Sequence, residues 1–241
     1  MTYRPKEVWD QRLKEQFDLR GTGETCLSVA YNEACYRLRR EVLDRALTEA
    51  GVDPAGQRVL DVGCGTGFFT RYYIERGAHV TGIDIAPTSI ERLGAHYPQA
   101  TFILGDVSET PVPGTFAIVN AFDVLYHITD DTRWEAAVRH LARAVAPAGV
   151  LLLTDRFAKF PRMETHNVAR MLDRYERVLL DEGLKVAGLH ETHVLLNREL
   201  GAFRFLNRFP ALLLRFDRLV LSMRRRRQDS NANTLLVARR S

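Results

Sequence analysis

A glycine-rich segment that follows an apolar run is the part of this sequence best suited to bind a ligand. Gly63, Gly65 and Gly67 alternate with other residues directly after the run Val59–Val62. A backbone without side chains can turn sharply and lets a ligand approach closely. Asp61, two residues before the first glycine, adds a carboxylate, which suits a ligand with an ammonium group better than a diphosphate. The segment therefore predicts a ligand-binding turn between a strand and a helix.

Spacing distinguishes two ligand classes that use such turns. The dinucleotide-binding fingerprint needs a third glycine three residues after the second, so that helix, strand and pyrophosphate pack closely. Phe68 occupies that position here. A nicotinamide dinucleotide is therefore disfavoured, although a bare tight turn without a ligand stays an alternative.

Two further acidic residues stand at the ends of later apolar runs. Asp84 ends the run 79–84, and Asp106 follows the run 102–105. Either residue alone would be an ordinary strand-end or helix-capping residue. Open α/β sheets, however, bind ligands at the carboxyl ends of their strands. A carboxylate also presents two acceptor oxygens to two adjacent hydroxyl donors, so the ordered set predicts one binding site.

An acidic residue followed by alternating glycines resembles the signature of the class I S-adenosylmethionine-dependent methyltransferases of small-molecule type, and the resemblance extends to Arg156. It implies S-adenosylmethionine as cofactor and S-adenosylhomocysteine as product. It also implies that Asp84 binds both ribose hydroxyls, that Asp106 lies beside the adenine amine, and that residues 120–127 form the floor beneath the methionine moiety. The cofactor-binding residues implied are Asp61, Gly63, Gly65, Gly67, Asp84, Ile85, Asp106, Val107 and Phe122.

Methyl transfer requires alignment, exclusion of water and, for some acceptors, removal of a proton. His127 is the candidate catalytic base, because imidazole titrates near neutral pH and this residue follows the fourth predicted strand. Its alternative is a helix-flanking histidine bonded to the backbone. The candidate substrate-binding residues are Tyr31, Tyr126, Arg156 and His166. For His166 a solvated loop position is the alternative.

The sequence predicts neither a metal site nor a disulfide framework. The three cysteines, Cys26, Cys35 and Cys64, are few and irregularly spaced, and an odd count fits a reducing compartment. His190 and His193 lie in a predicted strand, where residues three apart point to opposite faces. No stretch reaches the roughly 18 apolar residues of a membrane span, and no signal-peptide core is evident. We therefore expect a cytoplasmic protein.

Alternating strands and helices must position these residues. The chain has 241 residues, of which 46% are hydrophobic and 27% charged, as in ordinary globular proteins. Predicted strands lie at 59–62, 79–85, 101–104, 116–122, 150–154, 184–196 and 234–239, and predicted helices at 68–76, 88–97, 131–145 and 168–182. The pattern predicts a Rossmann-like, doubly wound α/β fold. Its seven-stranded sheet is expected to be mostly parallel, with an antiparallel C-terminal strand.

We assign this α/β domain to residues 51–241. One further segment precedes the domain, and another is inserted into it. Residues 1–50 form a predicted helical cap, with helices between about 8 and 47. An apolar, arginine-rich helical insert at about 199–228 precedes the last strand. Three interpretations of the insert stay open: a lid, a contact in a homodimer, or a helix on an anionic membrane surface. A packed lid or subunit contact is favoured.

The leading functional hypothesis is methylation of an oxygen, with nitrogen second, on a small-molecule metabolite. A nucleic-acid methyltransferase is an alternative, suggested by a pI near 9.1 and by Arg224–Arg227. Against it, residues 120–123 lack the Pro-Pro-aromatic element of similar base-methylating enzymes, and none of the cysteines follows the fourth or fifth strand. A catalytically silent module that binds S-adenosylmethionine is the third hypothesis.

Overall fold

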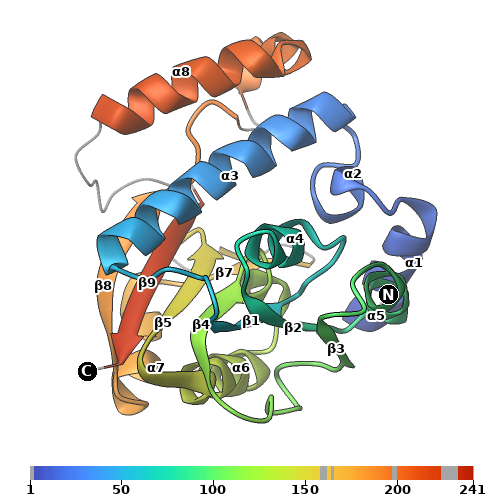
Figure 1. Ribbon diagram of the computed structural model, residues 1–241. Coiled ribbons are helices and arrows are strands. Elements are labelled where there is room, and N and C mark those ends of the chain that lie inside the picture. Colours follow the sequence, from blue (N-terminus) through green and yellow to red (C-terminus); the bar gives the residue numbers. More distant parts are fainter. Residues whose placement is uncertain (1–2, 158–161, 164–165, 197–199, 224–232, 241) are drawn as a thin grey trace.

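One seven-stranded sheet forms the centre of the protein (Figure 1). The computed structural model describes residues 3–157, 162–163, 166–196, 200–223 and 233–240. In spatial order the strands are β3 (Thr101–Leu104), β2 (His79–Asp84), β1 (Arg58–Val62), β4 (Phe116–Ala121), β5 (Val145–Asp155), β9 (Thr234–Arg240) and β8 (Leu184–Glu191). All neighbours up to β5 pair in parallel, and β9 runs antiparallel to both β5 and β8. The predicted fold class is confirmed.

The chain reverses its direction across the sheet between β1 and β4. From β1 it first builds outward through β2 to β3, and it then returns to add β4 on the other side of β1. In doubly wound sheets a crevice forms at this switch point, beyond the carboxyl ends of the strands. The glycine segment follows β1, so the topology places it at the crevice.

Helices cover both faces of the sheet, because side chains along a buried strand alternate between the two faces. Leu60 of β1 packs in a cluster with α6 (Asp131–Ala144) and α7 (Leu172–Asp181). Val59 packs on the other face with α3 (Val29–Ala50) and α4 (Phe68–Ile74). The remaining crossover helix, α5 (Pro87–His96), packs along β2 and β3.

The α7 helix begins four residues later than the sequence pattern predicts. Val168–Ala169 instead forms the short strand β7, paired with β6 (Arg162–Met163). Arg170 is 1% exposed and donates to Asp131 and to the Ile128 carbonyl. These bonds hold the segment extended against the start of α6, so the predicted helix over 168–171 is wrong. Similarly, β8 ends at residue 191 rather than 196.

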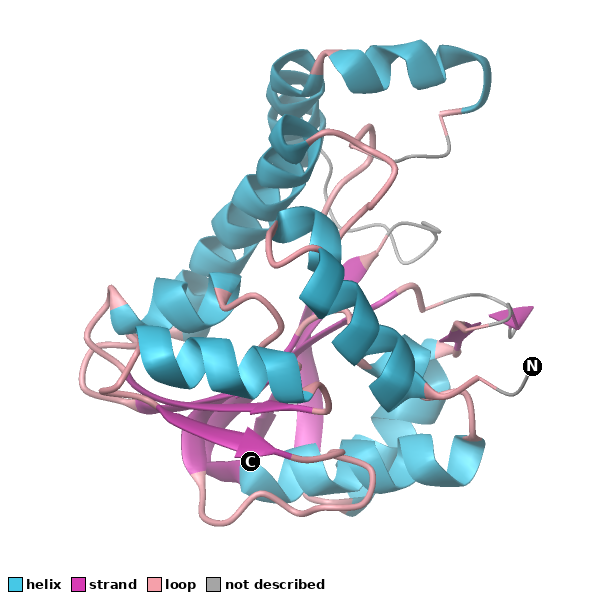
Figure 2. Cartoon of the chain, turned by 90° about the vertical axis from the view of Figure 1, so that its right-hand side faces the viewer, coloured by secondary structure: helices cyan, strands magenta, loops and turns pink. Residues whose placement is uncertain are grey.

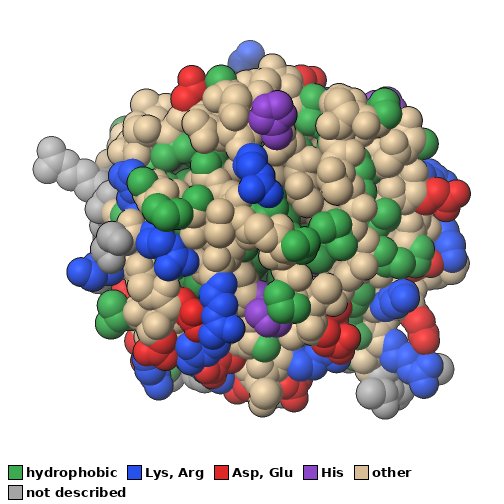
Figure 3. Space-filling view, turned by 60° about the horizontal axis from the view of Figure 1, so that its bottom comes forward, with side chains coloured by type: hydrophobic (Ala, Val, Ile, Leu, Met, Phe, Trp, Pro, Cys, Tyr) green, Lys and Arg blue, Asp and Glu red, His purple; other side chains and the backbone are tan. Residues whose placement is uncertain are grey.

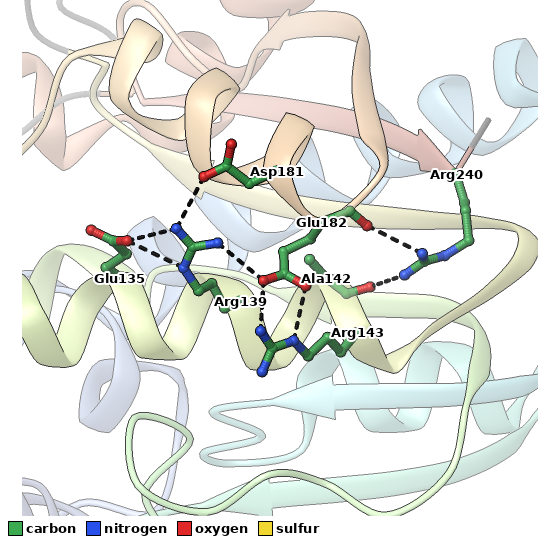
Figure 4. Close-up of polar contacts among 7 residues, drawn as sticks. All are labelled: Glu135, Arg139, Ala142, Arg143, Asp181, Glu182 and Arg240. Atoms are coloured by element: carbon green, nitrogen blue, oxygen red, sulfur yellow. Dashed lines mark hydrogen bonds and ion pairs between the residues drawn. The ribbon is translucent and has the colours of Figure 1, made fainter.

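Arginines of α6 join this helix to the end of α7 (Figure 4). Arg139 on α6 bonds Glu135, Asp181 and Glu182, at 2.8, 3.1 and 3.0 Å. Arg143 makes two bonds of 2.8 Å to the Glu182 carboxylate. Because Glu182 is largely buried and shared by two arginines, it ties α6 to the end of α7.

The N-terminal helices α1 (Pro5–Glu15), α2 (Leu19–Thr22) and α3 precede the sheet (Figure 1). The Ser28 side chain caps α3 by accepting from the Tyr31 amide, and Gly51 ends it in the left-handed region. A 3₁₀ segment, η2 (Gly201–Arg208), and α8 (Pro210–Met223) lie beyond α3, on its side away from the sheet (Figure 2). The described part of the insert thus packs on the cap.

Candidate active site

The glycine turn adopts a backbone that only glycine accommodates here. Gly63 has a φ of +68°, and a Cβ there would lie 2.3 Å from a methyl carbon of Val124. Gly65 has a φ of +51°, and its Cβ would lie 2.6 Å from a methyl carbon of Thr22. Left-handed φ values and missing space both exclude a side chain. The turn is therefore enclosed from two sides, by the segment that follows β4 and by Thr22 of α2.

A cavity opens at this turn, at the switch point of the sheet. Most of the predicted cofactor-binding residues line it: Asp61, Gly63, Gly65, Asp84, Ile85, Asp106, Val107 and Phe122. The exception is Gly67, which begins α4 and lies against Leu93. In this structure Gly67 is the N-cap residue of α4. Tertiary structure has thus brought together residues from four separate strand ends.

Asp84 is buried at the end of β2 and faces the cavity. Its Oδ2 accepts from the Gly65 amide and its Oδ1 from the Ala86 amide, both at 2.8 Å. Burial raises the pKa of Asp84 above its ordinary value, against these hydrogen bonds. Each carboxylate oxygen has a second lone pair that can accept from a ligand hydroxyl.

Asp61 supports the turn from behind. Its two oxygens accept from Thr70 Oγ1 at 2.6 Å and from Asn120 Nδ2 at 2.8 Å. Burial raises the pKa of Asp61 to about 6, although both hydrogen bonds lower it. The carboxylate thus connects β1, α4 and β4 at one point of the cavity wall.

Asp106 is engaged on both oxygens. Oδ1 accepts from the amide and the hydroxyl of Ser108, at 2.8 and 2.6 Å, and Oδ2 accepts from Arg133 at 2.7 Å. Arg133 lies on α6 and also lines the cavity. This arginine is not among the predicted site residues, because a cation on a crossover helix has no distinguishing local pattern.

The cap supplies a wall of the cavity. Trp9 and Leu13 of α1 line it, together with Thr22 and Tyr36. The Tyr36 hydroxyl donates to Thr22 Oγ1 at 2.8 Å, which holds α2 over the glycine turn. These residues were not predicted as site residues, although the four-residue spacing of Trp9 and Leu13 marks one face of a helix.

His127 lies on the cavity wall opposite the turn. Its Nδ1 is 3.3 Å from the backbone oxygen of His166, and the Trp9 ring meets it edge-on at a centroid distance of 4.8 Å. Burial lowers the pKa of His127 to about 4. The imidazole is therefore neutral near pH 7. If Nδ1 carries the proton toward the His166 carbonyl, Nε2 is the free acceptor.

A buried ion pair connects the cap to the end of β4. Arg39 of α3 lies 2.7 Å from Asp123, which also accepts from Asn233 and Thr154. Burial raises the pKa of Asp123, but Arg39 and the two hydrogen bonds outweigh it and bring the pKa below its usual value. Asp123 has a φ of +59°, a strained value for a residue other than glycine that is often found at functional sites. No local pattern predicts this contact, since its members come from four segments.

The candidate substrate-binding residues are placed differently from one another. His166 contacts His127 through its backbone, with the two rings 6.2 Å apart. Tyr126 is beside His127, at 4.4 Å between ring centroids, and Arg156 follows β5. Tyr31 packs instead between α3 and α8, among Leu38 and Leu213. None of these four candidates is among the residues that line the cavity in the described part of the chain.

Other side chains do not assemble into a metal site in the part of the chain that the structure describes: no group of three His, Cys, Asp or Glu residues there could hold an ion. Cys26, Cys35 and Cys64 are free thiols. No described helix combines the length and the apolar character needed to cross a membrane.

Comparison with known proteins agrees with this geometry. Residues 59–149 match the family model described as a methyltransferase domain. Malonyl-acyl-carrier protein O-methyltransferase of Serratia marcescens is 33% identical over 126 residues, which cover 51% of this chain and 47% of that protein. Ubiquinone biosynthesis O-methyltransferase of Pseudomonas aeruginosa is 34% identical over 109 residues, covering 42% and 44%. This chain thus spans about half the length of the curated relatives it matches.

Among solved structures, the S-adenosylhomocysteine complex of magnesium protoporphyrin IX methyltransferase from Synechocystis PCC 6803 superposes with a TM-score of 0.64. The identity is 18%, and the match covers 98% of both chains. Fold and cavity define a Rossmann-like α/β protein with a ligand site at the switch point. With the match of residues 59–149 to a methyltransferase domain, the chain is similar to methyltransferases in fold and in part of its sequence.

Proposed function

We propose that this protein transfers a methyl group from S-adenosylmethionine to an oxygen of a small-molecule metabolite. The observation that carries the proposal is the shared cavity of the glycine turn, Asp84, Asp106 and His127. The likeness to two O-methyltransferases supports the choice of oxygen over nitrogen.

The residues present fit this cofactor. The turn has no side chains at Gly63 and Gly65 to fill the space in front of β1, and the Asp84 carboxylate at the cavity wall is an acceptor for ligand hydroxyls. Val107 and Phe122 offer apolar surface to a flat ring or a thioether. When bound, the cofactor supplies an electrophilic methyl group on a sulfonium sulfur.

The cap and His127 provide the other two requirements of methyl transfer, exclusion of water and removal of a proton. Trp9, Leu13 and Tyr36 enclose the cavity and exclude water from it. For a hydroxyl acceptor, the proton released during transfer passes to Nε2 of His127. Because burial lowers the pKa of this histidine, it is a weak base, which suits an acidic hydroxyl such as a phenol. An acceptor that is already a carboxylate would need positioning alone.

We retain Tyr126, Arg156 and His166 as substrate-binding candidates near His127, although they stand outside the cavity lining itself. Tyr31 acts through α3 in this proposal, since it holds the helix that carries Tyr36 and Arg39. We also propose that residues 1–50 work as a cap on the domain formed by residues 51–241. A cytoplasmic location fits the three free thiols.

Two measurements test the proposal. Titration calorimetry with S-adenosylmethionine and S-adenosylhomocysteine should show binding of both. Incubation of the protein with cell extract and methyl-labelled S-adenosylmethionine should then label a compound in the small-molecule fraction. Binding without any labelled product would favour a silent binding module, and label in RNA would favour the nucleic-acid alternative.

A further inference from the structure

The insert presents a continuous apolar stripe to solvent. On α8 the side chains of Leu212, Phe216, Leu219 and Met223 are 44%, 48%, 52% and 67% exposed. Their spacing of four, three and four residues places all four on one face of the helix. The opposite face, with Leu213, Leu214 and Leu221, is buried against α3. Burial of the helix against the protein therefore does not account for the outer stripe.

The preceding η2 segment extends this apolar surface. Phe203, Phe205 and Phe209 are 64%, 57% and 56% exposed. Seven large apolar side chains thus lie on the surface within 21 residues of sequence. Contiguous exposed patches of this kind mark interaction sites in otherwise globular proteins. We define the outer surface of η2 and α8 as the insert face.

The charge on the insert face has a single sign. Arg204, Arg208 and Arg215 are exposed. The only acidic residue among the described residues 200–223 is Asp217, which is fully buried and accepts hydrogen bonds from the amides of residues 194–196. By contrast, acidic and basic side chains are interspersed on the face shown in Figure 3. The insert face therefore combines apolar side chains with uncompensated positive charge.

The packing holds this face in position. Arg218 forms an ion pair with Glu41 of α3, and the bonds to Asp217 fix the turn before η2. In Figures 1 and 2 α8 is the outermost layer, separated from the sheet by α3. A large flat surface could approach it without contact with the rest of the fold.

We propose that the insert face binds the surface of an anionic lipid bilayer. Exposed Phe and Leu side chains insert at the boundary between headgroups and acyl chains, while arginines pair with anionic headgroups. A second copy of the chain is a poorer occupant, because a symmetric contact would bring the arginines of both copies together. RNA is also poorer, because it would leave the apolar stripe in water. The inference stands independently of the acceptor and of the methyl-transfer chemistry.

Vesicle flotation tests the proposal. The full chain should float with vesicles of phosphatidylglycerol and phosphatidylcholine in equal amounts, and weakly or not at all with pure phosphatidylcholine. The triple variant Leu212→Ser, Phe216→Ser, Leu219→Ser should lose binding by tenfold or more, on the order expected from lost apolar burial. Leu180→Ser on α7, where Leu180 is 59% exposed, is the matched control and should bind normally.

A charge series separates electrostatic from apolar attraction. The triple variant Arg204→Gln, Arg208→Gln, Arg215→Gln should weaken binding to anionic vesicles by about a hundredfold at low salt. Arg177→Gln, an exposed arginine of α7, is its control. Circular dichroism and S-adenosylmethionine titration show whether each variant retains its fold.

Three outcomes would overturn the proposal. The first is absence of wild-type flotation, and the second is equal binding to anionic and neutral vesicles. The third is concentration-dependent dimerisation or RNA binding that the apolar triple variant abolishes while vesicle binding stays unchanged. Loss of methyl transfer with intact flotation would bear on the proposed function alone.

Discussion

At the scale of single residues, the site depends on carboxylates whose oxygens are already partly engaged. Asp84 accepts from two backbone amides, so it organises the turn and offers its remaining lone pairs to a ligand. The same residue thus has a structural and a binding role, and a substitution must separate them.

We expect Asp84→Ala to weaken S-adenosylmethionine binding by about 1.5 to 3 kcal/mol, the range for hydrogen bonds to a charged group. Asp84→Asn, which keeps one acceptor oxygen, should lose less. Titration calorimetry measures both, with the exposed Asp53→Ala as control. Unchanged affinity in Asp84→Ala would refute the ribose-binding role.

Turnover should fall by about two to four orders of magnitude in His127→Ala if the imidazole removes the acceptor proton. Cofactor affinity should stay nearly intact. Because burial lowers the pKa of His127 to about 4, the ascending limb of the rate against pH should lie near pH 4 rather than near 6.5. The exposed His96→Ala serves as control.

A His127→Ala variant that keeps more than about a tenth of wild-type turnover would restrict His127 to orienting the substrate. An acceptor that is anionic before transfer would explain that result. With such an acceptor, the pH profile of His127→Ala keeps the same limbs as that of the wild type. This result distinguishes an anionic acceptor from a failed measurement.

At the scale of elements, α1 is attached to the domain through the start of another helix. Asp10 of α1 accepts from the amide and hydroxyl of Thr88, at 2.9 and 2.8 Å, and so caps α5, whose own N-cap Ala86 cannot. The bond from Lys14, followed by the Thr88 amide, lowers the pKa of Asp10 to about 2. The Asp10 carboxylate therefore stays charged in mild acid and continues to attach α1 to the start of α5.

Asp10→Ala should cost about 0.5 to 2 kcal/mol, as for other lost helix caps. Amide hydrogen exchange in α1 should become faster, and cofactor affinity should drop because Trp9 and Leu13 no longer hold the cavity wall. Glu7→Ala, which removes only an exposed ion pair, is the matched control. Equal exchange in both variants would show that α1 is held by other contacts.

At the scale of the whole molecule, two partly buried histidines link stability to pH. Burial lowers the pKa of His127 and of His193 to about 4. Between about pH 4 and 6.5 the unfolded chain therefore binds more protons than the folded one, so their contribution to stability is complete above pH 6.5 and declines as the pH falls.

Urea denaturation above pH 6.5 and near pH 5 measures this contribution. Asp61 and Asp155 act in the opposite direction, because burial raises the pKa of each to about 6. The contribution of His193 is therefore the difference between the wild type and His193→Phe, and the wild type should lose stability relative to this variant as the pH falls from 6.5 to 5. Parallel curves for the two proteins would contradict the buried neutral state of His193.

The sequence by itself determined the strand that contains Asp61, the glycine turn and the acids of the next two strands. Each of these rests on local physics: an apolar run, a backbone that needs φ above zero, and a carboxylate at a strand end. The observed bounds of β2, β3 and α5 differ from the predicted ones by one residue at most.

Only the tertiary structure decided which residues complete the cavity. The Trp9–His127 contact of the α1 wall, the Arg133 contact to Asp106 and the Arg39–Asp123 pair join residues between 27 and 118 positions apart, where no local pattern specifies a partner. The extended 168–169 segment and the inward position of Tyr31 have the same origin. A helical or polar pattern predicts the local conformation of a residue, whereas long-range packing decides which neighbour that residue contacts.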